Sequence, residues 1–494
     1  MPPLPEPHAH PLLDLLLATP LQRGPGRPPL QRQLHARLRG AILDQRLPAH
    51  SRLPGSRALA QALGVSRNSV TAVYEQLASE GLMRPSRQGS LVAPLGAAPG
   101  AGSGAAAPQP LPPMAARVQG FPSHARGDGA TPGLRPGVPA LNRFPLAQWR
   151  RCLERAIQRG GAEALGYGLP EGEMALRTAI QQHLAVARGV VTAPQQILIT
   201  EGAQEALTLC LQLTTNPGDV AWVEDPGYRG AQSAFRAADL QIRPLAVDAQ
   251  GLCVPDAAQW ASRPPRVIYT TPSHQYPLGA VLPAQRRLQL MALAAEHGGW
   301  IIEDDYDSEF RHAGEPIGAM QGLSPGAPVL YVGTFSKTLF PSLRMGFLVL
   351  PAELHAQGRH LIRERLRGGH RLEQLALADF ISSGAFARHL GRMRRLYRAR
   401  RDGLVQALRE HLKVSHEVLG ADSGMHIALR LPPDLPDRLI AQQARDFGMA
   451  PAPLSGFFLN PQAADNGLVL GYGNTSQALY VPLVQRLQQI MEAL

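Results

Sequence analysis

The sequence predicts an α/β protein with two domains, a small helical domain at the N-terminus and a large domain built on a mainly parallel sheet. At 494 residues the chain is too long for one ordinary domain. Residues 94–113 form a low-complexity Ala/Pro/Gly stretch that cannot build a core. Beyond this stretch, β-like runs alternate with helical patterns, which favours a parallel sheet covered by helices.

The domain bounds follow from this composition. We predict a small domain over residues 1–93, a linker over 94–127 and a large domain over 128–494. Within the large domain, Pro283–His297 has a helical pattern, and a helix-rich tail from about residue 352 predicts a smaller subdomain. The predicted strands are Gln196–Thr200, Val220–Val223, Val267–Thr271, Trp300–Asp304 and Val329–Gly333.

The positive charge is concentrated in the small domain. The whole chain has a formal net charge of +11, and residues 28–93 contain nine arginines against three acidic residues, a net +6. A local basic excess of this kind suits an anionic partner such as nucleic acid.

Cysteine usage and hydropathy point to the cytoplasm. The three cysteines are widely spaced and odd in number, which is typical of reduced thiols in a cytosolic protein. No apolar run is long enough to cross a membrane, and the short apolar segment 12–18 lacks the basic start of a signal peptide. We therefore expect a cytoplasmic protein without a membrane partner.

The small domain is predicted to contain three helices followed by a hairpin. The second helix is short, over residues 56–63, and Ser56 can cap its start. Ser66 is predicted to cap the start of the third helix, and Gly81 is placed to end that helix. Two extended runs, 82–84 and 90–92, form the hairpin. The apolar faces of the first and third helices consist of Leu34, Leu38, Ala41 and Ile42, and of Val70, Val73, Tyr74 and Leu77.

Two helices joined by the tight turn Gly64-Val65 predict a helix-turn-helix that reads DNA. Arginine can bind guanine and asparagine can bind adenine in the major groove, so the start of the third helix is the candidate reader. Arg52 and Arg57 suit phosphate contacts. The alternative is a generic basic three-helix bundle. The hairpin, with Arg84, Arg87 and Gly89, would form a wing that approaches the DNA. The candidate DNA-binding residues are Arg52, Arg57, Ser66, Arg67, Asn68, Ser69, Arg87 and Gly89.

The run RLPGSRALAQALGVSRNSV, residues 52–70, resembles the winged helix-turn-helix of the GntR superfamily. The resemblance extends from about Pro29 to Val92 and implies binding to operator DNA. The wing departs from the family pattern Gly-x-Gly-Thr-x-Val, because residues 87–92 read RQGSLV and lack one glycine.

The large domain has a lysine at a chemically distinctive position. The chain contains only two lysines, Lys337 and Lys413, and Lys337 follows a predicted strand and the residues GTFS. A lysine at the carboxyl end of a parallel strand faces the ligand crevice, where its amine can form an imine with an aldehyde cofactor. Thr334 and Ser336 can donate to a phosphate, and Arg344 can bind that phosphate with two parallel hydrogen bonds.

Carboxylates end the preceding predicted strand, in the run Glu303-Asp304-Asp305-Tyr306. Buried carboxylates need a charged partner, and a protonated pyridine nitrogen is one such partner. Asp304 is the candidate, with Asp305 as the alternative, and Tyr306 suits the phenolic oxygen of such a ring. A solvated acidic turn or a metal site is the competing interpretation; with no second ligand cluster, we expect no metal.

Two further elements suit the same ligand. The free amides at the start of the helix after Thr200-Glu201-Gly202, at Ala203 and Gln204, can bind a phosphate. Tyr228 can stack on an aromatic ring, although a buried core tyrosine is the alternative.

Together these motifs resemble fold-type-I aminotransferases, and more narrowly the MocR/GabR-type regulators, in which a GntR winged helix is fused to such a domain. The resemblance covers most of residues 29–494. The matching runs are FPLAQW, GYGLPEGEMALR, TEGAQEAL, VEDPGY, TPSHQYPLG, EDDYDSEF, GTFSKTLFPSLRMG and LVLGYG.

This resemblance implies pyridoxal 5′-phosphate as the cofactor, held by Lys337 in a Schiff base. It places Asp304 at the ring nitrogen, Tyr306 at the phenolic oxygen and Tyr228 on the ring face. It also implies that Ala203, Gln204, Ser336 and Arg344 hold the phosphate. His274 and Gln275 fall where aminotransferases have a cofactor-side asparagine, and either of them is the candidate contact.

The sequence departs from aminotransferases at the substrate. These enzymes bind the amino-acid carboxylate with an arginine of the C-terminal subdomain, but residues 454–472 contain none. Arg229 is one possible substitute. We therefore expect a homodimeric regulator that binds operator DNA and senses pyridoxal phosphate, an amine or their adduct. The alternatives are an active aminotransferase with an accessory DNA-binding domain, and a DNA-binding protein whose inactive enzyme domain only dimerises.

Overall fold

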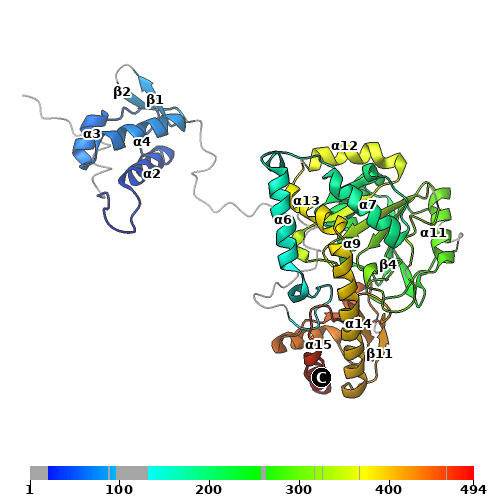
Figure 1. Ribbon diagram of the computed structural model, residues 1–494. Coiled ribbons are helices and arrows are strands. Elements are labelled where there is room, and N and C mark those ends of the chain that lie inside the picture. The colour runs from blue at the N-terminus through cyan, green and yellow to red at the C-terminus, as the bar shows by residue number, and fades with distance from the viewer. Residues whose placement is uncertain are drawn as a thin grey trace, which may run out of the picture. The chain divides into compact units, whose positions relative to one another are not determined.

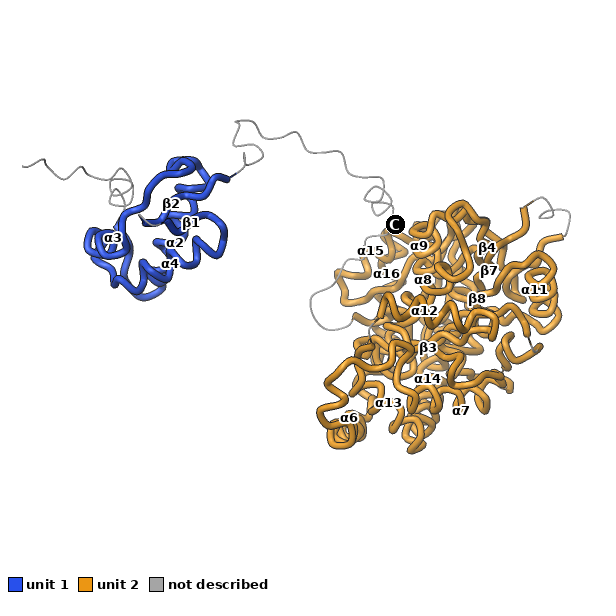
Figure 2. The backbone as a smooth tube through the Cα atoms, turned by 90° about the horizontal axis from the view of Figure 1, so that it is seen from above, with its two compact units in different colours: residues 1–110 blue, residues 111–494 orange. Residues whose placement is uncertain are grey.

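A computed structural model describes residues 20–86, 89–95, 132–256, 263–315, 317–324, 326–366, 368–462 and 464–494. The chain divides into two compact units, residues 1–110 and 111–494 (Figure 2). The division falls inside the segment 94–127. Most of that segment lies outside the described residues, so the bounds of the linker stay a prediction.

The first unit is a three-helix domain with a short hairpin. It contains α2 (Leu30–Leu43), α3 (Ser56–Leu63), α4 (Arg67–Ser79), β1 (Met83–Ser86) and β2 (Gly89–Val92) (Figure 1). All eight apolar residues predicted to face the core from the first and third helices are buried. The strands pair antiparallel, with Met83 opposite Val92, so the winged helix-turn-helix architecture is confirmed.

The ends of the helices in the first unit are defined by specific hydrogen bonds. The Ser66 hydroxyl accepts a hydrogen bond from the backbone N–H of Ser69 at 3.0 Å and caps α4 as predicted. Gly81, at φ +71°, lies just beyond α4, and the N–H of Leu82 bonds back to the carbonyl of Leu77. The predicted cap at Ser56 is wrong: Ser56 is the first residue inside α3, and Gly55 before it makes no side-chain cap.

The second unit is built on an eight-stranded sheet in the order β3-β10-β9-β8-β7-β4-β5-β6. Strands β5, β4, β7, β8 and β9 run parallel, whereas β10 and β6 are antiparallel to their neighbours. The bounds are β3 (Ile197–Thr200), β4 (Val220–Asp225), β5 (Gln241–Asp248), β6 (Gly251–Leu252), β7 (Val267–Thr270), β8 (Trp300–Asp305), β9 (Val329–Thr334) and β10 (Gly346–Val349).

Helices cover both faces of this sheet (Figure 1). One face packs against α8 (Ala203–Thr214), α9 (Arg229–Ala237) and α12 (His355–Arg365). The other side packs against α7 (Met174–Arg188) and α11 (Ala284–Glu296), and α6 (Leu146–Gly160) and α13 (Arg371–Ser382) lie beyond α7. This arrangement is the doubly covered α/β architecture that the alternating pattern predicts.

The C-terminal part forms a subdomain around a four-stranded antiparallel sheet in the order β11-β12-β14-β13. The long helix α14 (Ala385–His411) leads into it, and α15 (Asp437–Ala444) and α16 (Tyr480–Glu492) pack there. Its strands are β11 (Glu417–Leu419), β12 (His426–Arg430), β13 (Ala452–Pro453) and β14 (Gly467–Gly471). Among the described helices, none has the length and apolar character needed to span a membrane.

Candidate functional site

A cavity of about 290 Å³ opens at the carboxyl ends of the central strands of the second unit. Thr271 follows β7, Asp304 is near the end of β8, and Thr334 ends β9. The side chains at the carboxyl ends of these parallel strands therefore lie around the same cavity. The segment before α6, the start of α8, β12 and the loops after β4, β7, β8 and β9 supply the remaining lining. The residues that line the cavity are Pro136, Gly137, Ala203, Gln204, Tyr228, Tyr269, Thr271, Tyr276, Asp304, Tyr306, Asp307, Thr334, Ser336, Lys337, Pro341, Arg344, Met425 and His426.

Lys337 reaches into this cavity from the loop that follows β9. Its Nζ donates a hydrogen bond to the carbonyl oxygen of Gly137 at 2.8 Å. Desolvation lowers the pKa of the amine, while the carboxylates of Asp307 and Asp304 partly oppose this effect. A lower pKa increases the fraction of neutral amine, which is the nucleophilic form.

Asp304 lies in the cavity with one oxygen unsatisfied. Its Oδ2 accepts a hydrogen bond from the Tyr269 hydroxyl at 2.7 Å, whereas its buried Oδ1 has no partner among the described residues. Burial raises the pKa of this carboxyl to about 7. Such an orphaned oxygen needs a proton donor that the cavity itself does not supply.

Asp305, the alternative to Asp304, faces away from the cavity. Its Oδ2 accepts from Arg188 at 2.7 Å and from the Tyr331 hydroxyl at 2.5 Å. Burial acts to raise the pKa of Asp305, but Arg188 and the hydrogen bonds from Ser308 and Tyr331 together outweigh it and hold the pKa below its usual value. The structure therefore brings Asp304, and not Asp305, into the lining.

Groups that can bind an anion lie at one end of the cavity. Ala203 and Gln204 are the first residues of α8, where backbone N–H groups lack partners within the helix. Ser336 and Arg344 line the same cavity, and Arg344 donates to the carbonyl oxygen of Glu201 at 2.8 Å. Gly202, at φ +92°, turns the chain so closely past Arg344 that a Cβ there would lie 3.7 Å from the guanidinium.

Three tyrosines form an aromatic wall. Tyr228 and Tyr306 both line the cavity, and Tyr276 lies between them with ring centroids 6.0 Å and 5.6 Å away. Tyr276 was missed by the sequence interpretation. The available signal was its place in the same run as His274 and Gln275, directly before Pro277.

The two candidates at this position, His274 and Gln275, are not among the lining residues. Gln275 is buried and donates to the carbonyl oxygen of Pro226 at 2.8 Å. The Nδ1 of His274 lies 2.9 Å from Asp307, and the Tyr306 hydroxyl donates to the His274 carbonyl oxygen at 3.0 Å. Both residues therefore lie behind the three tyrosines of the aromatic wall and not in the cavity lining.

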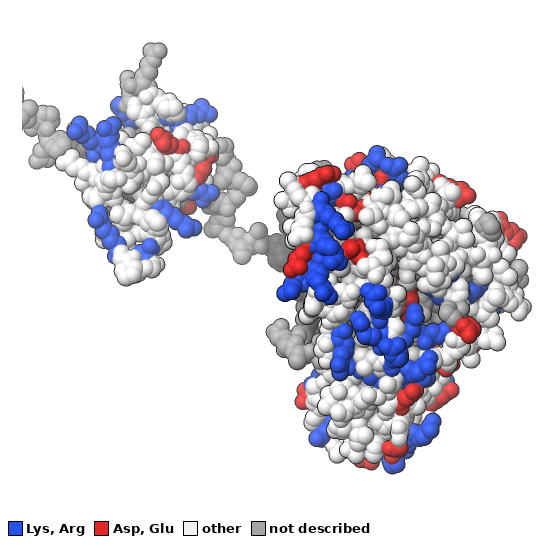
Figure 3. All heavy atoms as spheres, viewed as in Figure 1, with Lys and Arg blue, Asp and Glu red and all other residues white. Residues whose placement is uncertain are grey.

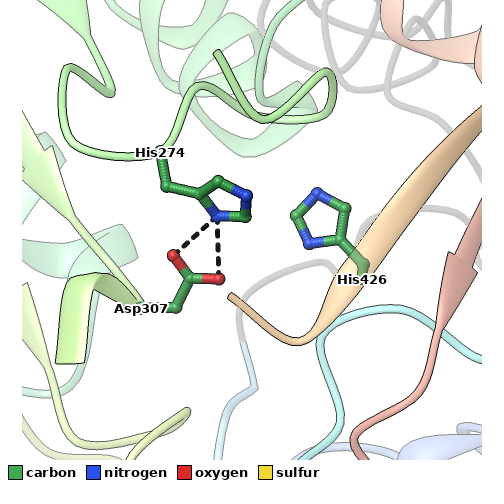
Figure 4. A group of neighbouring side chains, drawn as sticks. All are labelled: His274, Asp307 and His426. Carbon is green, nitrogen blue, oxygen red and sulfur yellow. Dashed lines mark hydrogen bonds and ion pairs between the residues drawn. The ribbon is translucent and has the colours of Figure 1, made fainter. Parts of the chain in front are cut away.

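Asp307 and His426 line the cavity but were not expected there. With His274 they form a buried group whose nitrogen and oxygen atoms lie within 4.8 Å of one another (Figure 4). Figure 4 shows the His274 ring between the Asp307 carboxylate and the His426 ring. Because His274 and Asp307 are directly hydrogen-bonded, we interpret this group as a support for Tyr306.

In the first unit, the predicted DNA-reading residues lie together at the start of α4. Ser66, Arg67 and Asn68 are exposed, and Ser69 is half-buried. Arg52, Arg57, Arg84 and Gly89 are also exposed. The backbone of Arg52 pairs with Leu91 of the hairpin, which places it beside the wing. Arg87 lies outside the described residues.

Comparison with known proteins matches both units. Residues 140–449 match the family described as aminotransferase class I and II, and residues 30–92 match the bacterial regulatory proteins of the gntR family. The chain is 38% identical over 450 residues to the probable rhizopine catabolism regulatory protein MocR of Rhizobium meliloti, covering 90% of each chain.

Two further proteins resemble the chain over most of its length. It is 32% identical to the pyridoxine biosynthesis transcriptional regulator PdxR of Corynebacterium glutamicum, covering 93% of this chain and 96% of the relative. Among solved structures, the α-aminoadipate aminotransferase LysN of Thermus thermophilus, complexed with N-(5′-phosphopyridoxyl)-L-leucine, is 25% identical with a TM-score of 0.67. That match covers 78% of this chain and 97% of LysN.

Proposed function

The chain belongs to the MocR-type transcriptional regulators, in which a gntR-family DNA-binding domain is joined to an aminotransferase class I and II domain, and we propose that its second unit binds pyridoxal 5′-phosphate. We further propose that this binding changes the affinity of the first unit for operator DNA. Two sites that influence each other's affinity in this way are coupled reciprocally, so operator binding also changes the affinity for the ligand.

The observation that carries the proposal is the orphaned Oδ1 of Asp304. A protonated pyridine nitrogen is the donor that this oxygen lacks, and its positive charge favours the ionised carboxylate. Lys337 lies in the same cavity with a depressed pKa. The start of α8 and Arg344 supply the N–H donors that a phosphate needs. The residues present therefore fit this cofactor.

Each residue has a distinct part in holding the ligand. When bound, the cofactor supplies an aldehyde that reacts with amines and a ring that acts as an electron sink. Lys337 would provide the amine, Asp304 would hold the ring nitrogen in its protonated form, and the Tyr306 hydroxyl would turn from the His274 carbonyl oxygen to donate to the phenolic oxygen. Tyr228 at one end of the aromatic wall and Tyr276 in its middle would exclude water from the ring.

The charges of the lining favour an effector without a carboxylate. Within the described residues, Arg344 is the one arginine that lines the cavity, and it lies at the phosphate end. Arg229, a possible substitute anchor, lies beside Gly456 and outside the lining. We infer that the effector is pyridoxal phosphate itself or its adduct with a simple amine. The relative PdxR is a pyridoxine biosynthesis transcriptional regulator, which agrees with this inference.

We propose that the regulator acts as a homodimer in the cytoplasm. Leu165, Tyr167 and Leu169 are 77%, 85% and 52% exposed in the segment after α6, which is unusual for large apolar side chains close together. A second copy of the chain would cover them. Two DNA-reading domains per dimer predict an operator with two half-sites.

The direct experiment is to add pyridoxal phosphate to the cofactor-free protein and to record the visible absorbance. We expect a new band that saturates at one cofactor per chain in the wild type and that is absent in Lys337→Ala. A band of equal intensity in the variant would contradict the assignment of the lysine.

The second candidate function is a working aminotransferase, which the Lys337, Asp304 and Tyr306 set favours. Incubating the cofactor-loaded protein with amino acids and a keto acid separates the two functions. The sensor predicts no sustained turnover, because among the described lining residues the one arginine, Arg344, lies at the phosphate end and is not free to anchor an amino-acid carboxylate. Steady turnover at rates typical of enzymes would favour the aminotransferase.

A further inference from the structure

The long helix α14 of the second unit carries an unusual concentration of positive charge. It contains eight arginines against two acidic residues, a net +6, whereas residues 128–494 together have a net +3. The remainder of that region is therefore net negative, at −3. Figure 3 shows Lys and Arg side chains gathered over α14 and α6 on one face of the second unit.

The arginines of α14 lie on its solvent face. Arg388, Arg392 and Arg395 follow the i, i+4, i+7 spacing of one helix stripe, and Arg398 lies one turn further along. All four are exposed. The opposite side of the helix is buried in the core through Leu390, Met393, Tyr397 and Leu404. We call Arg392, Arg395 and Arg398 the α14 basic face.

The α14 basic face is not neutralised by the protein. Two neighbouring arginines do have acidic partners, since Arg394 pairs with Glu309 at 3.2 Å and Arg401 with Asp402 at 2.6 Å. By contrast, the three members of the basic face form no ion pair within the described residues. Holding like charges together without counterions is unfavourable, so this face favours an anionic partner.

We propose that the α14 basic face binds the phosphate backbone of duplex DNA, as a contact surface additional to the winged helix. The helix segment from Arg392 to Arg398 is about 9 Å long, and extended arginine side chains lengthen its reach at both ends. The major groove of B-DNA is about 12 Å wide. Arginines at the two ends of the segment can therefore reach phosphates on both sides of one groove. Guanidinium groups bind phosphates through two parallel hydrogen bonds and carry no sequence information.

This inference rests on the DNA binding of the first unit and is independent of the cofactor. The chain is a DNA-binding regulator, so duplex DNA is the polyanion that it meets when it functions. An acidic protein surface is the other partner that the charge would fit. The experiment below separates DNA from such a protein, because only contacts with DNA alter the salt dependence of operator binding.

The test compares two full-length variants that remove the same charge. The first is the triple substitution Arg392→Gln, Arg395→Gln and Arg398→Gln. The matched control replaces three exposed arginines on other elements of the same unit, Arg236→Gln, Arg243→Gln and Arg445→Gln. The dissociation constant for an operator fragment is measured between 50 and 200 mM salt. Visible absorbance with pyridoxal phosphate and the melting temperature verify that both variants are folded.

Each phosphate contact contributes about 0.9 to the slope of log affinity against log salt. If all three arginines contact phosphates, the wild type loses about 40-fold more affinity than the α14 variant over this fourfold salt range. The control should retain the wild-type slope. Equal slopes in all three proteins would overturn the α14 contact while leaving DNA binding intact. If the wild type does not bind the operator fragment at all, both the α14 contact and DNA binding by the first unit are overturned.

Discussion

The amine of Lys337 donates a hydrogen bond to the carbonyl oxygen of Gly137 at 2.8 Å and so joins two positions 200 residues apart. Gly137 has φ +77°, and a Cβ at this residue would lie 3.1 Å from the Lys337 Nζ. The segment before α6 thus forms a wall directly against the reactive amine. Glycine at 137 therefore leaves room beside the Lys337 amine that a side chain would occupy.

The first prediction concerns this contact. Gly137→Ala should weaken the binding of pyridoxal phosphate, because the methyl group crowds the amine and displaces the lysine. Absorbance titration of the cofactor-free protein measures the effect.

The control is Gly189→Ala. Gly189 has a similar backbone conformation, φ +65°, and no atom lies within 4 Å of a Cβ built there. Both substitutions should cost about 1 kcal/mol of stability from the left-handed backbone. Only Gly137→Ala should change the cofactor affinity, and an equal change in both variants would show that backbone strain, rather than the lysine contact, is responsible.

A second prediction concerns pH and Asp304. Burial raises the pKa of this carboxyl from 3.8 to about 7 in the folded protein. Between these values the folded state holds a proton that the unfolded state releases, so the free energy of unfolding falls as pH rises. The loss for the cofactor-free protein is on the order of 4 kcal/mol above pH 7.

Asp304→Asn removes this titration because the amide is neutral at every pH. Urea unfolding at pH 5 and at pH 8, without cofactor, should show a smaller decrease in stability for the variant than for the wild type. The Asp225→Asn variant is a useful comparison, since the pKa of Asp225 is also raised by burial but its carboxylate accepts a backbone hydrogen bond from Leu459. Identical pH dependence in the wild type and Asp304→Asn would exclude Asp304 as the cause.

A third prediction concerns the DNA-reading helix. Arg67 is exposed at the first position of α4, where it can bind a base edge. Arg67→Ala should weaken operator binding by about 1–3 kcal/mol, or roughly 5- to 150-fold. The visible spectrum with pyridoxal phosphate should not change. Arg243→Ala in the second unit is the matched control, and a variant of Arg67 that binds the operator as tightly as this control would place the reading residues elsewhere.

Much of the fold was accessible from sequence because the core strands are continuous apolar runs and the helices have clear stripes. The five predicted strands of the sheet occur within about two residues of their predicted ends. Strand β10 was missed because Gly346–Val349 has only four residues and begins with a glycine. The sheet of the C-terminal subdomain was missed for a similar reason, since β11 has three residues and β13 has two.

The site was accessible where one motif carries the chemistry, as at Lys337, Asp304 and Arg344. It was not accessible where distant segments meet. Asp307 follows β8 and His426 begins β12, about 120 residues later, so no local sequence pattern reports that their side chains lie close together. The wall formed by Gly137 depends equally on a long-range contact.

The central claim is that occupancy of the Lys337 cavity controls DNA binding. The measurement is a titration of the cofactor-free protein with pyridoxal phosphate, in which visible absorbance and operator affinity are recorded on the same samples. We predict that operator affinity changes over the same concentration range as the absorbance, without any added amino acid, and that Lys337→Ala abolishes both changes. Operator affinity that stays constant while the absorbance saturates, or that responds only after an amino acid is added, would contradict the account.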